Sequence, residues 1–252
     1  MGRASRRKRN ALRRRPSSCL SCGATAALTR EHIVARWVRR ELERNEGDGL
    51  GRWVRVKGEA GHSESRDYAR FDIEGNLLCQ QCNNGWSSQL ERQANGAALS
   101  LIRPSLLVIP LAVEAEQILA AWLAKMAILD EYVEGRISET FARSLISPIA
   151  TRLAAPEKVR VWLGTLTRHR YFRHGWWRMA INSGILHAIS TGDLLGLVVL
   201  PVEASPTPAA FAAHDEAFLH IWPVPVPKSW PPTRSVSIDQ LNRAFGVSPR
   251  ID

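Results

Sequence analysis

Four cysteines, the only ones in the 252-residue chain, form two Cys-x-x-Cys pairs: Cys19 with Cys22, and Cys79 with Cys82. One tight turn can aim both sulfurs of such a pair at the same ion, and four thiolates are a tetrahedral zinc-binding set. A simple zinc ribbon separates its two pairs by roughly 15 to 20 residues, whereas 56 residues lie between Cys22 and Cys79. We therefore expect a structural Zn²⁺ whose two halves bracket a folded insertion.

The insertion carries the residues best suited to chemistry, the neighbours Glu31 and His32. A neutral imidazole can take a proton from an attacking water, and a carboxylate can hold a hard divalent cation such as Mg²⁺. Asn83, directly after Cys82, offers a carbonyl oxygen to the same cation if the helix start packs against the Glu31 strand. Such a set suits phosphodiester hydrolysis, because the cation stabilises the leaving oxygen. A Glu-His pair can also be purely structural, but its place between two zinc knuckles favours catalysis.

The elements that must position these residues can be read from hydrophobic periodicity. Val34 to Arg44 has helical spacing, Trp53 to Lys57 alternates as a strand, and Tyr68 to Ile73 is a second candidate strand after a polar loop around Gly61 to Arg66. Ser88 and Glu91 have capping-box spacing, which predicts a helix beginning just after the second knuckle.

The rest of the chain divides into a helical part and a mostly β part. The stretch from Pro104 to Ser147 is predicted to be helical, with a main core helix from Glu114 to Glu134. The apolar stretch from Leu99 to Val133 is interrupted too often by charged residues and prolines to span a membrane. After Glu157 the period changes to two. Further strands are predicted near 171–181, 185–190, 194–201 and 218–222, and a short last helix is capped by Ser237 and Gln240.

Positive charge is concentrated in an N-terminal arm. The net charge is +10, and residues 1–15 carry eight of the 34 basic side chains and no acid. The arm comprises Arg3, Arg6, Arg7, Lys8, Arg9, Arg13, Arg14 and Arg15. Such a run is expected to be disordered when free and to bind polyanions, with DNA the leading partner; the alternative is a solubilising arm without a dedicated partner. It lacks the apolar stretch of a secretory signal, and thiol pairs without an export signal fit the cytoplasm.

The segments CLSC, LTREHIVARW and LLCQQCNNGW together resemble the zinc-containing branch of the HNH endonucleases, whose core is a ββα-metal finger. The resemblance covers roughly residues 17–95. It implies that His32 is the general base, that Glu31 replaces the commoner Asp as a metal ligand, and that Asn83 takes the last ligand position, usually with magnesium. It also implies that the four cysteines hold the structural zinc.

The chain departs from the family pattern in three places. The middle Asn usually lies about nine residues before the last ligand, whereas Asn76 lies seven before Asn83; Asn76 could orient the backbone or could be a turn residue. Asn84 beside Asn83 leaves open which amide meets the metal. The insertion from Arg44 to Arg66 goes beyond the compact finger.

Other candidates are weaker. His62 lies in a Gly-rich segment and is expected to be a solvated loop residue. The stretch from Arg168 to Arg178, with His169 and His174, mixes basic and aromatic residues. This composition suits either a nucleic-acid surface or an amphipathic hairpin whose aromatic side chains fill the C-terminal core. A phosphate-binding P-loop, a dinucleotide fingerprint and a Gly-x-Ser-x-Gly elbow are all missing from the sequence.

The sequence thus predicts an α+β protein. We expect a basic arm (1–15), a zinc-stapled HNH-like domain (16–100), a helical bridge (101–150) and a mostly β C-terminal domain (151–252). The expected activity is metal-dependent cleavage of DNA. The alternative is a non-catalytic zinc module that binds nucleic acid or a protein partner.

Overall fold

A computed structural model gives the structure of the protein. It describes residues 15–38, 40–41, 53–59, 62–68, 74–103, 108–167, 174–181, 184–203, 217–223, 228–232, 234–237, 240–241 and 244. Residues 1–14, which make up nearly all of the predicted arm, lie outside this range. The described chain combines helices and sheets, as expected for an α+β protein.

A two-stranded antiparallel sheet carries the predicted chemistry. It pairs β1 (Leu28–His32) with β4 (Glu74–Cys79), and the Glu31-His32 pair ends β1. The chain becomes helical immediately afterwards, through α3 (Gln80–Cys82), the π-helical turn η1 (Asn83–Ser87) and α4 (Ser88–Ile102).

A helix follows the second knuckle, as predicted, and α4 begins at Ser88. The predicted capping role is wrong, because helical backbone already begins at Gln80 and Ser88 itself has right-handed helical φ and ψ. Its hydroxyl accepts a hydrogen bond from Arg92 one turn later instead of capping the helix. Gly85, with φ −85° and ψ −110°, interrupts the helical geometry inside η1. The extra residue of a π-turn re-aims the side chains around it, and these include Asn83 and Ser87.

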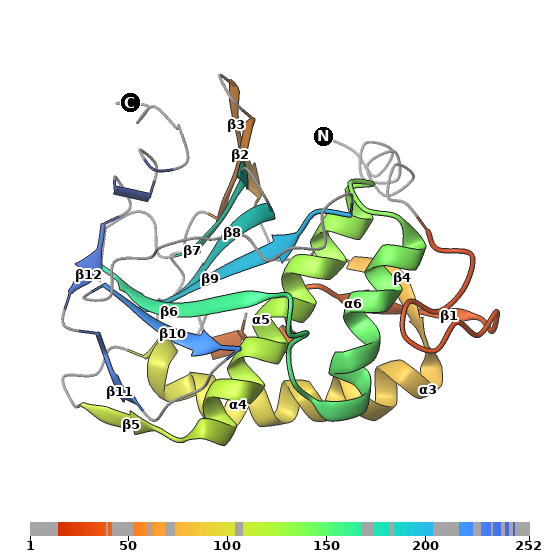
Figure 1. The fold of residues 1–252 in the computed structure, drawn as a ribbon, viewed down its shortest axis with the longest axis horizontal. Coiled ribbons are helices and arrows are strands. Elements are labelled where there is room, and N and C mark those ends of the chain that lie inside the picture. Colours follow the sequence, from red (N-terminus) through yellow and green to blue (C-terminus); the bar gives the residue numbers. More distant parts are fainter. Residues whose placement is uncertain are drawn as a thin grey trace.

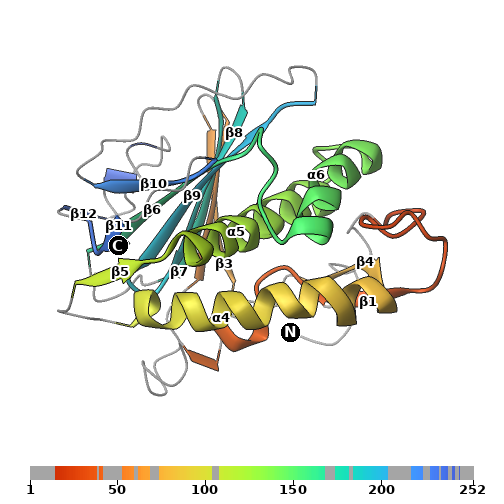
Figure 2. The same ribbon diagram turned by 60° about the horizontal axis from the view of Figure 1, so that its bottom comes forward.

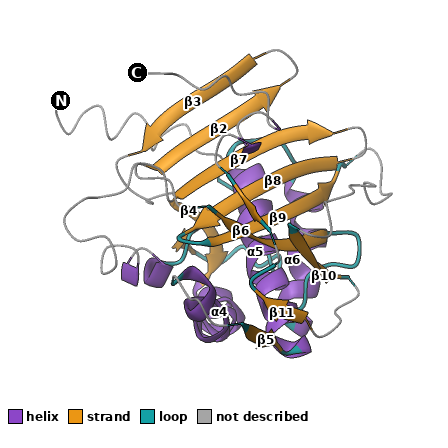
Figure 3. Cartoon of the chain, turned by 90° about the vertical axis from the view of Figure 1, so that its left-hand side faces the viewer, coloured by secondary structure: helices purple, strands orange, loops and turns teal. Residues whose placement is uncertain are grey.

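The large sheet has eight strands, seven of them in the order β10-β6-β9-β8-β7-β2-β3 (Figure 3). The eighth, β12, pairs with β6. Its strands are β2 (Trp53–Glu59), β3 (His62–Tyr68), β6 (Arg160–Leu166), β7 (His174–Ile181), β8 (Gly184–Thr191), β9 (Leu194–Pro201), β10 (Phe218–Trp222) and β12 (Ser235–Val236). The β2–β7 and β12–β6 pairs are parallel and the others are antiparallel.

The predicted loop from Gly61 to Arg66 is wrong, since β3 begins at His62 and pairs with β2 in a hairpin. His62 is therefore a strand residue. The hairpin comes from the predicted N-terminal domain, yet β2 pairs with β7 of the predicted C-terminal domain. Of the predicted strand from Tyr68 to Ile73, residues 69–73 lie outside the described range.

Helix α5 (Val113–Val133) lies between the large sheet and α4, and α6 (Glu139–Arg152) packs beside it (Figures 1 and 2). The bounds of α5 agree with those of the predicted core helix, Glu114 to Glu134, to within one residue at each end. Every side chain of α5 from Leu119 to Val133 is buried, as is Glu116, and four of the buried residues are charged: Glu116, Lys125, Asp130 and Glu131. No helix among the described residues is long and apolar enough to cross a membrane.

A small sheet of β5 (Ile109–Leu111) and β11 (Lys228–Trp230) lies at one end of α4, and α3 with the β1–β4 sheet lies at the other (Figure 1). The strand at β5 corrects the prediction that the whole stretch from Pro104 to Ser147 is helical. Among the described residues β11 pairs with β5 alone, so one of its edges makes no ladder hydrogen bonds. Prolines are tolerated around such an edge strand because they have no N–H to donate.

Candidate metal centre and active-site cleft

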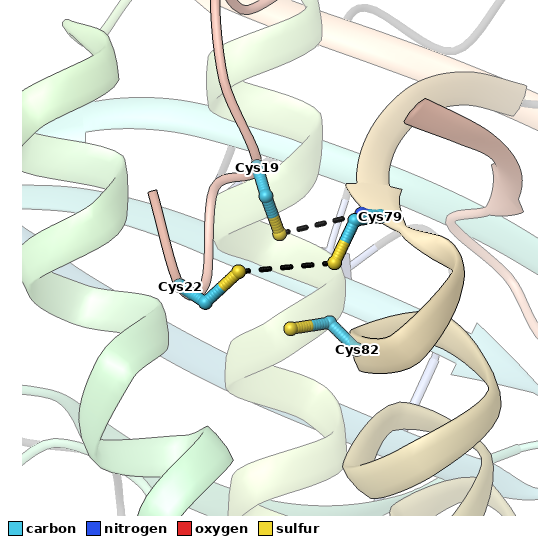
Figure 4. A group of neighbouring side chains, drawn as sticks. All are labelled: Cys19, Cys22, Cys79 and Cys82. Carbon is cyan, nitrogen blue, oxygen red and sulfur yellow. Dashed lines mark hydrogen bonds between the residues drawn. The ribbon is translucent and has the colours of Figure 1, made fainter. Parts of the chain in front are cut away.

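The four cysteines converge at the junction of β4 and α3. Their sulfur atoms all lie within 4.8 Å of one another and point toward a common centre (Figure 4). Cys22 Sγ and Cys79 Sγ are 3.7 Å apart. Two sulfurs on a tetrahedral Zn²⁺ with bonds of about 2.3 Å are roughly 3.8 Å apart. The donor set and its spacing therefore fit one metal ion such as zinc.

Backbone hydrogen bonds shape the first knuckle around Cys19. The Gly23 N–H donates to the Cys19 carbonyl at 2.9 Å, and Gly23 itself has φ +74°, which favours glycine. The Cys79 N–H donates to Cys19 Sγ at 3.3 Å, so a hydrogen bond joins the two knuckles independently of a metal ion. Burial alone would raise the pKa of Cys19, but backbone N–H groups of Cys22, Cys79 and Ser21 lower it to about 7.

Cys82 has the opposite environment. Burial and the neighbouring thiols raise its pKa to about 12 in the metal-free chain. Because a cysteine binds metal as its thiolate, metal binding at neutral pH would have to displace this proton.

A cleft of about 410 Å³ opens beside the end of β1. It is lined by Arg30, Glu31, His32, Arg36, Trp37, Arg40, Asn83, Ser88, Glu91, Arg92 and Asn95. All three predicted catalytic residues thus share one cleft, which the β1–β4 pairing and the helix start create together. Four arginines against two glutamates give its lining a net positive charge at neutral pH.

His32 is held by Glu74 on the neighbouring strand, with Nε2 2.7 Å from Glu74 Oε1. Arg36 Nε also lies 3.2 Å from the same nitrogen. A nitrogen that donates to a carboxylate cannot also accept from a guanidinium, so we assign the hydrogen to Nε2 from the shorter contact. In a neutral imidazole the other nitrogen, Nδ1, is then the one able to accept a proton.

The side chain of Glu31 is buried and contacts Lys125 and Ser87. Its Oε1 lies 2.5 Å from Lys125 Nζ and accepts a hydrogen bond from Ser87 Oγ at 3.0 Å. Lys125 Nζ also donates to Ser87 Oγ at 2.7 Å and to Glu91 Oε1 at 3.0 Å. Burial alone would lower the pKa of Lys125, but the carboxylates of Glu31 and Glu91 raise it above its ordinary value. Sequence reasoning missed Lys125, Ser87 and Glu91 as members of this site.

Asn83 joins the helix start to β1, as the predicted geometry requires. Its Nδ2 donates to Thr29 Oγ1 at 2.9 Å and approaches the Arg30 carbonyl at 3.4 Å. Because the amide nitrogen is engaged by β1, the amide oxygen is the end that can meet a cation. Asn84 is exposed and does not line the cleft, which favours Asn83 as the cleft residue.

Asn76 lies within β4 and not in a turn, so the turn interpretation is wrong. It pairs with Arg30 at a register shift between Thr29 and Arg30. A bulge of this kind re-aims neighbouring side chains, and an orienting role for Asn76 stays a prediction.

The other candidates fall away from the cleft or outside the described residues. Trp176 and Trp177 are fully buried, so these two aromatics belong to the core and not to a nucleic-acid surface. His169 lies in the undescribed segment 168–173, and the side chains of His62 and His174 are not described. Of the predicted DNA-binding arm, only Arg15 is described, and it is exposed.

A second cluster, Asp130, Glu131 and His187, also brings possible ligand atoms within 4.8 Å of one another. Arg178 Nε lies 2.6 Å and Arg136 Nη1 2.9 Å from Glu131 Oε1. Arg178 Nη2 also donates to Glu131 Oε2 at 3.1 Å, so protein cations engage both oxygens of this carboxylate. We therefore interpret the cluster as a structural ionic network between α5 and the sheet.

Comparison of the chain with protein-family models, curated protein sequences and solved structures gives no match. The functional argument therefore depends on the residues of the cleft and the cysteine cluster.

Proposed function

We propose that the protein is a metal-dependent endonuclease of the HNH type that hydrolyses phosphodiester bonds in DNA. The observation that carries the proposal is that Glu31, His32 and Asn83 line one positively charged cleft beside the four-cysteine cluster. An antiparallel strand pair followed at once by a helix supports a ββα-metal finger built around a structural zinc.

In this proposal each cleft residue has a separate task. His32 Nδ1 takes a proton from the attacking water, while Glu74 holds the imidazole through Nε2. Glu31 and the Asn83 amide oxygen would hold a divalent cation such as Mg²⁺, which when bound stabilises the leaving oxygen. Arg36 and Arg92, which line the same cleft, bind the phosphate of the substrate.

Plasmid nicking by zinc-loaded protein tests the proposal directly. We expect nicking with Mg²⁺ or Mn²⁺, and its loss in His32→Ala and Asn83→Ala. Asn84→Ala is the matched control, because this exposed asparagine is adjacent in sequence but does not line the cleft. Folded, zinc-loaded protein that nicks the plasmid with none of the divalent metals tested would refute the proposal.

The second candidate is a non-catalytic zinc module that binds nucleic acid or a protein partner. One observation favours it: Lys125 and Ser87 already engage one oxygen of Glu31, as in a structural ion pair. The two candidates differ in His32→Ala, which should abolish cutting but spare zinc content and DNA affinity if the protein is a nuclease. An inactive wild type that still binds DNA would support the module.

The predicted arm adds a separate test of DNA as the partner. Deleting residues 1–15 should weaken DNA binding and flatten its salt dependence, since fewer counterions are released from the phosphates. An unchanged salt slope would show that the arm does not contact phosphate.

A further inference from the structure

Lys125 is a buried ammonium that reaches the cleft wall from behind. It lies in the middle of α5 and is 1% exposed. Its three partners come from three other elements: Glu31 from β1, Ser87 from η1 and Glu91 from α4. An ammonium has three N–H donors, and the three contacts use all of them.

The contacts fix the orientation of the carboxylate that the proposed function uses. Ser87 Oγ accepts from Lys125 and donates to Glu31 Oε1, so the three groups form a closed hydrogen-bonded set around one oxygen. A carboxylate held by one oxygen cannot rotate without breaking two short contacts. Glu31 also lines the cleft, and its second oxygen, Oε2, which none of these contacts uses, is left to meet a cation.

We propose that Lys125 is a positioning residue, which holds Glu31 Oε1 so that the carboxylate presents a divalent cation with a fixed ligand in the cleft. This inference rests on the proposed function. It goes beyond a stabilising ion pair, because it assigns Lys125 an effect on how tightly the cation is held. Partners that orient metal ligands from behind typically change metal affinity or activity about 10- to 100-fold when removed.

The test must separate orientation from charge and from folding. Lys125→Met alone leaves the buried carboxylate of Glu31 and the half-buried carboxylate of Glu91 without their cation, and such a loss can prevent folding. The double variant Lys125→Met/Glu91→Gln keeps the formal charge of the cluster at −1, as in the wild type. It leaves Glu31 with Ser87 as its only retained partner among the contacts described here.

The measurement is the Mg²⁺ concentration that gives half-maximal plasmid nicking, with zinc content and melting temperature recorded in parallel. We expect this concentration to rise about tenfold in the double variant. Glu91→Gln alone, which keeps the Lys125–Glu31 contact, should raise it much less. The readout does not depend on the folded fraction, because unfolded molecules lower the rate without changing the Mg²⁺ dependence of the remainder.

A double variant that retains the wild-type Mg²⁺ dependence would overturn the assignment while leaving the nuclease proposal intact, as would an equal rise in Glu91→Gln. A wild type that cuts with no divalent metal added, or not at all, would instead overturn the proposed function and with it this role for Lys125.

Discussion

The ionic network at Glu131 makes the sharpest prediction about stability. The fully buried carboxylate of Glu131 accepts from Arg178 Nε at 2.6 Å and Nη2 at 3.1 Å, and from Arg136 Nη1 at 2.9 Å. His187 Nε2 lies 3.2 Å away, and its Nδ1 accepts from Trp176 Nε1 at 2.9 Å. Because Arg178 lies on β7 and His187 on β8, the network ties α5 to the large sheet.

Glu131→Gln removes the charge while keeping the shape of the side chain. Removing one partner of a buried ion pair costs about 3 to 5 kcal/mol, because the other charge is left without compensation. The side chain of Arg136 is 18% exposed and retains Glu134 at 3.1 Å, so it can be compensated by water and by that contact. Arg178 is buried, and its described side-chain contacts are all with Glu131, so no other described carboxylate compensates its charge. We therefore expect a loss near the lower end, about 3 kcal/mol.

Urea unfolding at pH 7, followed by tryptophan fluorescence, measures this loss as a change in the free energy of unfolding. Glu134→Gln is the matched control, since Glu134 also pairs with Arg136 but is 25% exposed; its cost should stay within about 1 kcal/mol. A loss in Glu131→Gln no larger than in this control would refute the reasoning.

The same network gives a pH dependence with a defined sign. Burial alone would raise the pKa of Glu131, but contacts with His187, Arg178 and Arg136 lower it below its ordinary value of 4.5. A depressed carboxyl pKa contributes stability that is present above the unfolded value and is lost as pH falls below it. The difference between wild type and Glu131→Gln should therefore shrink as pH falls below about 4.5.

Three further predictions concern other parts of the fold. The pKa of Glu139 is lowered from 4.5 to about 2, since hydrogen bonds from Ser18 outweigh its burial; Glu139→Gln should therefore flatten the fall of melting temperature between pH 4.5 and 2, and an unchanged fall would contradict this. Gly192 has φ +63°, and an added Cβ would lie 2.4 Å from the Ile102 carbonyl oxygen; Gly192→Ala should cost about 2 to 3 kcal/mol in urea unfolding, and a neutral variant would disprove the clash. Because zinc must displace the Cys82 proton, zinc affinity should fall as pH falls, measured by transfer to a colorimetric chelator; a pH-independent affinity would contradict the four-thiolate site.

Elements with strong local signals could be predicted from the sequence. The strands β9 and β10 have the predicted bounds, and the Ser237–Gln240 capping box is confirmed by reciprocal hydrogen bonds of 2.7 and 3.1 Å. In these cases the residues that decide the structure are neighbours in the chain. Local periodicity and capping therefore suffice.

Elements decided by distant partners could not be predicted. The β2–β7 pairing joins Trp53 to His174 across more than a hundred residues, and no local pattern specifies it. The Ser88–Glu91 spacing was misleading for a different reason. Helical backbone already extends from Gln80, so the same residue types occur inside a helix, where Glu91 turns to Lys125 instead of capping.

The candidate site shows the same division. The cysteine pairs and the Glu31-His32 dipeptide are visible in the sequence because their spacing is local, and the structure brings them to one region. Lys125 was missed because it lies far downstream within an apolar helix, where it reads only as an interruption. A single lysine on the core face of such a helix is the signal that could have identified it, since a buried ammonium requires nearby carboxylates.

Helix α5 links the cleft to the sheet through two buried charges six residues apart. Six residues correspond to about 9 Å along the axis and to a rotation of roughly 240°, so Lys125 and Glu131 project from different faces. Lys125 meets β1 and α4, whereas Glu131 meets β7 and β8. Because the two charges contact different elements, a rotation or shift of α5 that lengthened the contacts of Lys125 would also disturb those of Glu131. The contacts of Glu131 with β7 and β8 therefore help to hold α5, and with it the Lys125 ammonium, in place behind the cleft.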